Sequence, residues 1–216
     1  MDLKMKIKSG QTILFIGDSI TDCGRRTTDR PLGNGYVKLF ADMLTIRESR
    51  KKISVINKGI GGDVVTGLRD RWHDDVIRNK PDWLSIKIGI NDLHRTLGQS
   101  PDAVSPELYL EAYQDILAST QSDLPGCKIL LIDPFYISNE SSPNSFRSSV
   151  LNLIPEYLRI IRRLSKKHKT LHVKTHEVFQ QLLKTHDPGT FGPEPVHPFL
   201  TGHLVIAEAV YSVLNS

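Results

Sequence analysis

Ser19 is the residue of this chain whose position best suits nucleophilic chemistry. It follows the apolar run 13–16 and the pair Gly17-Asp18, and an apolar run that ends in glycine is typical of a buried parallel strand. Open α/β sheets bind ligands at the carboxyl ends of their strands, so we expect the Ser19 hydroxyl at such an edge. A helix N-cap is the simpler role for a serine in this place. The Gly-x-Ser-x-Gly pattern is absent, which disfavours an α/β-hydrolase.

A histidine near the C-terminus is the candidate base for that hydroxyl. His197 lies three residues after Glu194 in a proline-rich segment, and a carboxylate at this spacing can fold back across a tight turn onto Nδ1. The imidazole then keeps the tautomer that leaves Nε2 facing Ser19. His203 is a competing base, although it falls on a predicted helix. Asp187, ten residues before His197, is a competing acid.

Two segments at later strand ends supply hydrogen-bond donors for a negatively charged oxygen, which ester hydrolysis by a serine also needs. Gly62 lies in the glycine-rich segment 57–63, where the backbone can approach another group closely. Its N–H is a candidate donor, and Gly61 is a close competitor. Asn91 comes shortly after the predicted strand 83–88, and its side-chain amide can donate to an oxyanion. A plain turn is the alternative role for both segments.

Short apolar runs alternate with helical patterns along the chain. This alternation predicts βαβ units and a mainly parallel sheet. The predicted strands cover residues 12–17, 53–57, 83–88, 128–133 and 171–174. The predicted helices cover residues 35–47, 65–78, 106–121, 147–168, 175–185 and 200–214. Polar loops are expected over residues 22–34, 98–105 and 137–146.

The composition is that of an ordinary globular protein. The chain has 216 residues, of which 39% are hydrophobic and 24% charged, and a formal net charge of +4. This length favours a single domain over residues 1–216. The basic residues occur as short, scattered pairs, which favours solvated helix faces over a nucleic-acid-binding patch.

Export and membrane insertion are not indicated by the sequence. The two cysteines, Cys23 and Cys127, are too few for a disulfide framework or a thiolate metal site, so a reducing compartment fits better than secretion. The segment 1–10 has no sustained apolar stretch of the signal-peptide type. No segment has the roughly eighteen apolar residues that span a bilayer. We therefore expect a cytoplasmic protein that binds neither nucleic acid nor membrane.

Taken together, these segments resemble the SGNH hydrolases, also called GDSL esterases and lipases. The matching blocks follow the family's order over nearly the whole chain, and they are Gly17-Asp18-Ser19, Gly62, Gly89-Ile90-Asn91-Asp92 and His197-Pro198. Further stretches look like intracellular acetylxylan esterases of this family, namely residues 15–24, 57–60, 80–83, 88–92 and 134–137. The resemblance implies a three-layer α/β/α sandwich with a flavodoxin-like, five-stranded parallel sheet of order 2-1-3-4-5.

The resemblance also implies a mechanism without metal or organic cofactor. Ser19 attacks the ester carbonyl, His197 accepts its proton and Glu194 orients the imidazole. The N–H groups of Ser19 and Gly62 and the amide of Asn91 hold the oxyanion. The family has an aspartate where this chain has Glu194, which is one methylene longer. The identity of the orienting acid is therefore left open at this point.

The substrate that the resemblance implies is a small-molecule, short-chain carboxylic ester, such as an O-acetyl group on a xylo-oligosaccharide or a related sugar. A thioesterase or lysophospholipase of the same family is the alternative, and a carbohydrate-binding pseudoenzyme is a second one, prompted by Glu194. The candidates for lining the acyl and alcohol pockets, with core packing as the alternative, are Tyr36, Trp72, His94, Arg95, Phe135 and Tyr136. Association into a homo-oligomer is reasonable for this family.

Overall fold

The structure of the protein, a computed structural model, describes residues 4–216 and centres on one parallel β-sheet. The strand order is β2-β1-β3-β4-β5, as predicted, and all neighbouring strands are parallel. The strands are β1 (Thr12–Gly17), β2 (Ser54–Asn57), β3 (Trp83–Lys87), β4 (Lys128–Ile132) and β5 (Leu171–Val173). The first three residues of the segment 1–10, in which we expect no leader, lie outside the described part of the chain.

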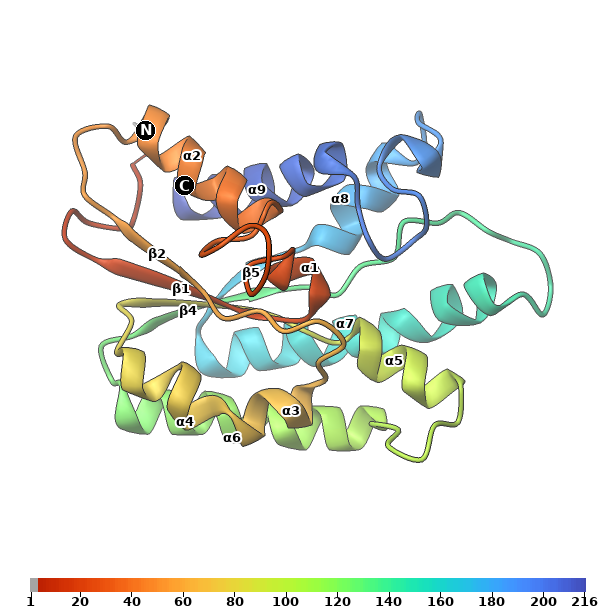
Figure 1. The fold of residues 1–216 in the computed structure, drawn as a ribbon. Coiled ribbons are helices and arrows are strands. Elements are labelled where there is room, and N and C mark those ends of the chain that lie inside the picture. Colours follow the sequence, from red (N-terminus) through yellow and green to blue (C-terminus); the bar gives the residue numbers. More distant parts are fainter. Residues whose placement is uncertain (1–3) are drawn as a thin grey trace.

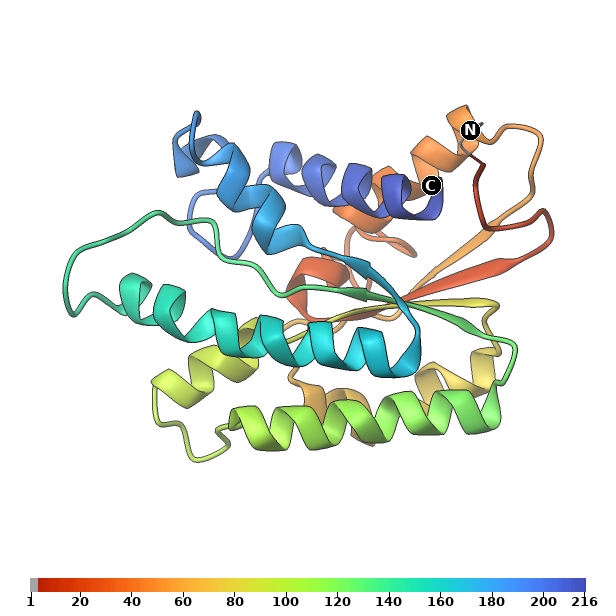
Figure 2. The same cartoon turned by 180° about the vertical axis from the view of Figure 1, so that it is seen from behind.

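Helices cover both faces of the sheet, which gives the three predicted layers (Figure 1, Figure 2). The helices on one face are α2 (Tyr36–Arg47), α8 (Thr175–Leu182) and α9 (Leu200–Leu214). Those on the other face are α3 (Val65–Asp70), α4 (Trp72–Asp75), α5 (Ile90–Leu97), α6 (Pro106–Asp123) and α7 (Phe146–His168). The short elements are the single turn α1 (Ser19–Asp22) and the 3₁₀ turns η1 (Ile77–Asn79) and η2 (Pro188–Thr190).

The central strands are largely apolar because helices cover both of their faces. Strand β3 is buried throughout, and β1 and β4 are buried beyond their first residues, whereas the edge strands β2 and β5 are more open. Local signals also start the helices. The Ser105 hydroxyl accepts a hydrogen bond from the Leu108 N–H at 3.3 Å, and Pro106 occupies the first turn of α6.

The predicted continuous helix over 65–78 is wrong. The segment forms α3, α4 and the 3₁₀ turn η1 as separate pieces. Arg71 lies between α3 and α4 and has non-helical backbone angles, φ −102° and ψ 8°. Its guanidinium donates hydrogen bonds to the carbonyl oxygens of Gly17, the last residue of β1, and Lys58, the residue after β2. The break therefore accompanies long-range bonds that a helical pattern in the sequence does not reveal.

Helix α5 is a second difference, because no helix was predicted over residues 90–97. It begins directly after Gly89, whose φ of +134° favours glycine. A Cβ at Gly89 would lie 2.8 Å from the Tyr109 hydroxyl, so the close packing of α6 also requires a glycine here. Asn91 consequently lies in the first turn of a helix.

Two charged side chains are buried between the ends of β1 and β3. Asp18 is the N-cap of α1, and its Oδ1 accepts a hydrogen bond from the Ile20 N–H at 3.0 Å. Its Oδ2 lies 3.5 Å from Lys87 Nζ, and neither side chain is exposed. Burial lowers the pKa of Lys87, and the Asp18 carboxylate opposes this effect. The pair joins two strand ends directly behind Ser19.

Replacing Lys87 by methionine should destabilise the fold strongly, because the Asp18 carboxylate would stay buried without its counter-ion. We expect the free energy of unfolding, measured by urea denaturation, to fall by about 3–5 kcal/mol. The matched double variant Asp18→Asn/Lys87→Met keeps a capping oxygen and removes both charges, so it should recover most of this loss. Equal stability of Lys87→Met and the double variant would contradict the role of the pair.

Candidate active site

The hydroxyl of Ser19 and the imidazole of His197 meet although 178 residues separate them in the sequence. Ser19 is the first residue of α1, and His197 lies in the loop before α9. The distance from Ser19 Oγ to His197 Nε2 is 2.9 Å, which is a normal hydrogen-bond length. The contact has the geometry that a nucleophile and its general base require.

Glu194 occupies the other nitrogen of the imidazole. Its Oε1 lies 2.6 Å from His197 Nδ1 and also accepts a hydrogen bond from the His197 N–H at 2.7 Å. Its Oε2 accepts one from the Val196 N–H, again at 2.7 Å. These two backbone bonds fold the longer glutamate side chain back over its own turn. The extra methylene therefore does not prevent contact with the histidine.

The charges of this pair support each other. Partial burial disfavours the charge on Glu194, but the hydrogen bonds from the imidazole and the two amides lower its pKa to about 2. The hydrogen bond with Glu194 raises the pKa of His197, and partial burial opposes this effect. An imidazolium that forms at His197 is thereby stabilised by a carboxylate that stays ionised.

The competing residues lie in other contacts. Asp187 caps the turn η2, where its Oδ1 accepts a hydrogen bond from the Gly189 N–H at 2.7 Å. His203 is buried, with Nδ1 accepting from the Tyr36 N–H at 3.3 Å and Nε2 at 3.4 Å from Cys23 Sγ. Burial lowers the pKa of His203 to about 4 and raises that of Cys23 to about 12. The thiol and this imidazole are therefore neutral at physiological pH.

The backbone N–H groups of Ser19 and Gly62 are the candidate donors to a ligand at the Ser19 hydroxyl. Among residues 4–216, the N–H groups of Ser19 and Gly62 have no hydrogen-bond acceptor. The Gly61 N–H, by contrast, donates to Asp22 Oδ2 at 3.0 Å. Gly62 has a φ of +78°, and open space lies where its Cβ would be. Between the two glycines, Gly62 is thus the one whose N–H can serve an oxyanion.

Asn91 is tied to the same loop. Its Nδ2 donates to the Asp63 carbonyl oxygen at 2.9 Å, which uses one of the two amide hydrogens. The neighbouring Asp92 is buried, and its Oδ1 accepts from the Val65 N–H at 2.9 Å. Burial raises the pKa of Asp92 to about 7, and the hydrogen bond from Val65 counteracts this shift. The start of α5 therefore holds the loop around Gly62 through two adjacent side chains.

Arg71 holds the loop around Gly62 in place through Asp63. This residue was not identified from the sequence. Its Nη2 donates to the Gly17 carbonyl at 3.3 Å and its Nη1 to the Lys58 carbonyl at 2.8 Å. The same guanidinium bonds to the carboxylates of Asp63 at 2.8 Å and Asp75 at 2.6 Å. One side chain thus connects the end of β1, the residue after β2 and the loop around Gly62. No motif in the sequence singles out this arginine.

Three of the predicted pocket residues are core residues, so the expectation that they line a substrate pocket is wrong. Tyr36 and Phe135 are fully buried and Trp72 nearly so. The Tyr36 hydroxyl bonds to Thr21 Oγ1 at 3.0 Å, and Trp72 Nε1 donates to Thr120 Oγ1 at 3.0 Å. Their polar atoms have partners inside the protein, as buried tyrosine and tryptophan require.

The other candidates lie in an aromatic cluster near the imidazole. His94 on α5 packs edge-to-face against Tyr136 and against Phe146, at 5.8 and 5.2 Å between ring centroids. Tyr136 is nearly buried, whereas Phe146 is 50% exposed and was not foreseen. Burial lowers the pKa of His94, and the charges of Glu194 and His197 also act on it. Arg95, a further candidate, donates to the Gly62 carbonyl at 2.9 Å and so supports the loop.

The site itself is open to solvent. The His197 side chain is 60% exposed and the Glu194 side chain 39%.

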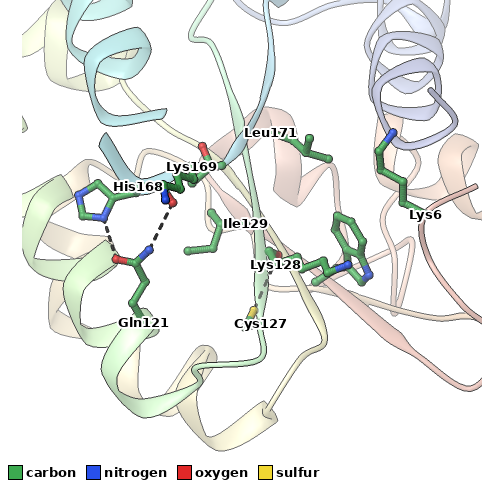
Figure 3. A pocket seen from close by; sticks show the side chains of 10 residues that line it. Lys6, Gln121, Cys127, Lys128, Ile129, His168, Lys169 and Leu171 are labelled. Atoms are coloured by element: carbon green, nitrogen blue, oxygen red, sulfur yellow. Dashed lines mark hydrogen bonds between the residues drawn. The ribbon is translucent and has the colours of Figure 1, made fainter. Parts of the chain in front are cut away.

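A separate pocket of about 380 Å³ lies at the amino ends of β3, β4 and β5 (Figure 3), at the opposite edge of the sheet. It is lined by Lys6, Trp83, Gln121, Cys127, Lys128, Ile129, His168, Lys169, Thr170 and Leu171, none of which belongs to the site.

Comparison with known proteins gives the class. The model of the GDSL-like lipase/acylhydrolase family matches residues 15–205, and the chain belongs to this family. It is therefore a carboxylic ester hydrolase, and its fold is that of the SGNH hydrolases.

Individual relatives narrow the similarity further. The chain is 39% identical to an acetylxylan esterase of Geobacillus stearothermophilus over 95% of its own length and 94% of that protein. The crystal structure of Axe2, an acetylxylan esterase from the same organism, has a TM-score of 0.88 and 34% identity over 98% of this chain and 97% of that one. LAE5, an α/β hydrolase from the metagenome of Lake Arreo in Spain, has a TM-score of 0.86 and 29% identity over 97% of both chains.

Replacing Arg71 by methionine should slow ester hydrolysis, because the loop around Gly62 would lose the guanidinium that fixes it to two strand ends. We expect kcat on p-nitrophenyl acetate to fall about 10²-fold, the usual result of a misplacement near 1 Å. The control is Arg78→Met, since that arginine is 69% exposed and precedes β3 at the far edge of the sheet. An Arg71→Met enzyme with the kcat of this control would show that Arg71 does not position the loop.

Proposed function

We propose that Ser19, His197 and Glu194 form a catalytic triad that removes O-acetyl groups from xylo-oligosaccharides or related sugars through an acyl-enzyme. The observation that carries this proposal is the continuous chain of contacts, 2.9 Å from Ser19 Oγ to His197 Nε2 and 2.6 Å from His197 Nδ1 to Glu194 Oε1. Hydrolysis by a serine depends on this order of nucleophile, base and orienting acid.

The solved structures support the assignment. They include catalytic mutants of Axe2 in which a serine, an aspartate or a histidine is changed to alanine, and the aspartate lies three positions before the histidine. Glu194 and His197 have this spacing here. The acetylxylan substrate is proposed from the relatives, since the chain is 39% identical to an acetylxylan esterase over 95% of its length.

In the proposed mechanism, Ser19 Oγ attacks the ester carbonyl carbon while its proton passes to His197 Nε2. The carbonyl oxygen becomes an oxyanion, which the N–H groups of Ser19 and Gly62 and the amide of Asn91 stabilise. His197 then gives its proton to the leaving alcohol, and the acetyl group stays on Ser19. Water, which gives a proton to the same imidazole, then attacks the acyl carbon. The bond from this carbon to Ser19 Oγ breaks, acetate leaves, and His197 returns the proton to Ser19 Oγ. Glu194 stays ionised throughout.

The acyl part of the proposed substrate is a short group and not the long chain of a lysophospholipase substrate. A long chain requires an apolar groove that begins at the nucleophile. One apolar groove, of about 610 Å³, lies between β5, α8 and α9, and its lining contains no triad residue. A thioesterase for short acyl groups would use the same triad. Assembly of all three side chains argues against a binding-only pseudoenzyme.

Three further features stay predictions. They are the single domain over residues 1–216, the cytoplasmic location and the association of copies. Within residues 4–216, no helix combines the length and the apolar character that crossing a membrane requires.

The direct test is covalent labelling with a serine-directed phosphonate. We expect one adduct, located on Ser19 by peptide mass spectrometry, together with loss of p-nitrophenyl acetate hydrolysis in Ser19→Ala. Hydrolysis should then fall across p-nitrophenyl esters of increasing chain length and persist on acetylated xylose and xylobiose. An adduct on another residue, or a Ser19→Ala enzyme of normal activity, would refute the assignment of the nucleophile.

The pH profile tests the role of Glu194. Activity requires neutral His197, so kcat rises with pH through the His197 pKa, which Glu194 raises. In Glu194→Gln the pKa of His197 should fall, so the acidic limb of the kcat–pH profile should move to lower pH while its plateau drops by up to about 10⁴-fold. Glu194→Asp, which keeps the charge, is the control and should retain the acidic limb of the native enzyme. An unshifted limb in Glu194→Gln would assign the orienting role to another group.

A further inference from the structure

A cationic groove lies beside the proposed site along the open edge of β2. It has a volume of about 490 Å³ and is lined by Arg25, Arg26, Arg30, Pro31, Leu32, Val55, Ile56, Asn57 and Lys58. Four of these side chains are cations, and no acidic residue lines the groove. The mechanism proposed above uses none of them.

Two of the four cations lack an acidic partner. Arg25 Nε donates to the Gly59 carbonyl at 2.6 Å, and Arg30 donates to the Arg26 carbonyl. Neither forms an ion pair with an acidic side chain of residues 4–216, whereas Arg26 pairs with Asp22. Arg25 is half-buried, and burial lowers its pKa, whereas the charges of Asp22 and Asp75 oppose this effect. No carboxylate among the described residues contacts the guanidinium directly, so an anionic ligand in the groove could form a charge-assisted hydrogen bond with it.

Arg26 connects the groove to the nucleophile. Its Nε donates to Asp22 Oδ2 at 2.8 Å, and the same oxygen accepts the Gly61 N–H at 3.0 Å. A Cβ placed on Gly61 would lie 3.9 Å from Arg26 Nη2 and 3.9 Å from Ser19 Cβ. Arg26 Nη2 and Ser19 Cβ can therefore be no farther apart than the sum of these two distances. The Arg26 side chain is 50% exposed, and no described residue accepts a hydrogen bond from its Nη atoms.

We propose that this groove binds an anionic group on the alcohol part of the substrate, with Arg26 as the specificity-determining residue. The proposal rests on the proposed function, in which the acyl part is an acetyl group and carries no charge. The preferred substrates are therefore acetylated sugars that also bear a carboxylate or a phosphate. Both anions match the planar donor fork of arginine. The source of the anion, a uronic acid or a sugar phosphate, is decided by the experiment.

The test compares kcat/KM for three acetyl esters with the same ring, those of glucose, glucuronic acid and glucose 6-phosphate. At least one anionic ester should exceed the neutral ester by about tenfold at low salt, and this ratio should shrink at high ionic strength. Arg26→Gln should lower the ratio several-fold, and Arg26→Lys should restore part of it. Arg78→Gln, which removes one exposed cation at the far edge of the sheet, should leave the ratio unchanged.

The ratio separates this proposal from the proposed function. Any damage to the oxyanion loop through Asp22 lowers the rates on all three esters and cancels in the ratio. Equal kcat/KM on neutral and anionic esters, or a ratio that Arg26→Gln leaves intact, would overturn the anion preference. Absence of hydrolysis of every ester by the native enzyme, or hydrolysis that survives Ser19→Ala, would instead overturn the proposed function.

Discussion

The catalytic edge of the sheet depends on charged side chains that are buried between strand ends and cannot lose their partners. Asp18 and Lys87 are both inaccessible, and their charges lie 3.5 Å apart directly behind Ser19. Arg71 has a similar role between the ends of β1 and β2. Its guanidinium forms hydrogen bonds with two backbone carbonyl oxygens and two carboxylates. Because an unpaired buried charge costs several kcal/mol, each group permits few local arrangements of the loops around it. Ser19 and the loop around Gly62 inherit that rigidity.

The histidine segment is fixed by a different means, because its side chains are partly exposed. Glu194 accepts hydrogen bonds from two backbone N–H groups of its own turn as well as from the imidazole. Those backbone bonds determine where the carboxylate lies. The longer side chain of Glu194 therefore contacts His197 as the shorter aspartate of the family is expected to do. The exchange of aspartate for glutamate thus changes the path of the side chain and preserves the charge beside Nδ1.

The sequence predicted the fold and the residues that make contact across the sheet, because strand ends obey topology. Strand β1 has the predicted bounds 12–17, and the strand order places Ser19, Gly62 and Asn91 at one edge. Side-chain environment was less predictable. Aromatic residues such as Tyr36 and Trp72 are common both in binding pockets and in cores. The periodicity of the sequence does not distinguish the two environments. The helix break at Arg71 could not be predicted either, since it accompanies bonds to residues far away in the sequence.

The exposure of the proposed triad limits what the enzyme can recognise. With the His197 side chain 60% exposed, the reacting ester lies at the surface, and little of the alcohol is enclosed. Selectivity for the alcohol must then come from contacts at the rim of the site. The chain has two such regions, the aromatic surface of Phe146 beside His94 and the cationic groove at Arg26. An aromatic ring packs against the apolar face of a sugar, whereas a guanidinium binds its anionic substituent. Because these contacts differ in their response to salt, the ionic strength dependence of kcat/KM distinguishes which of them selects the substrate.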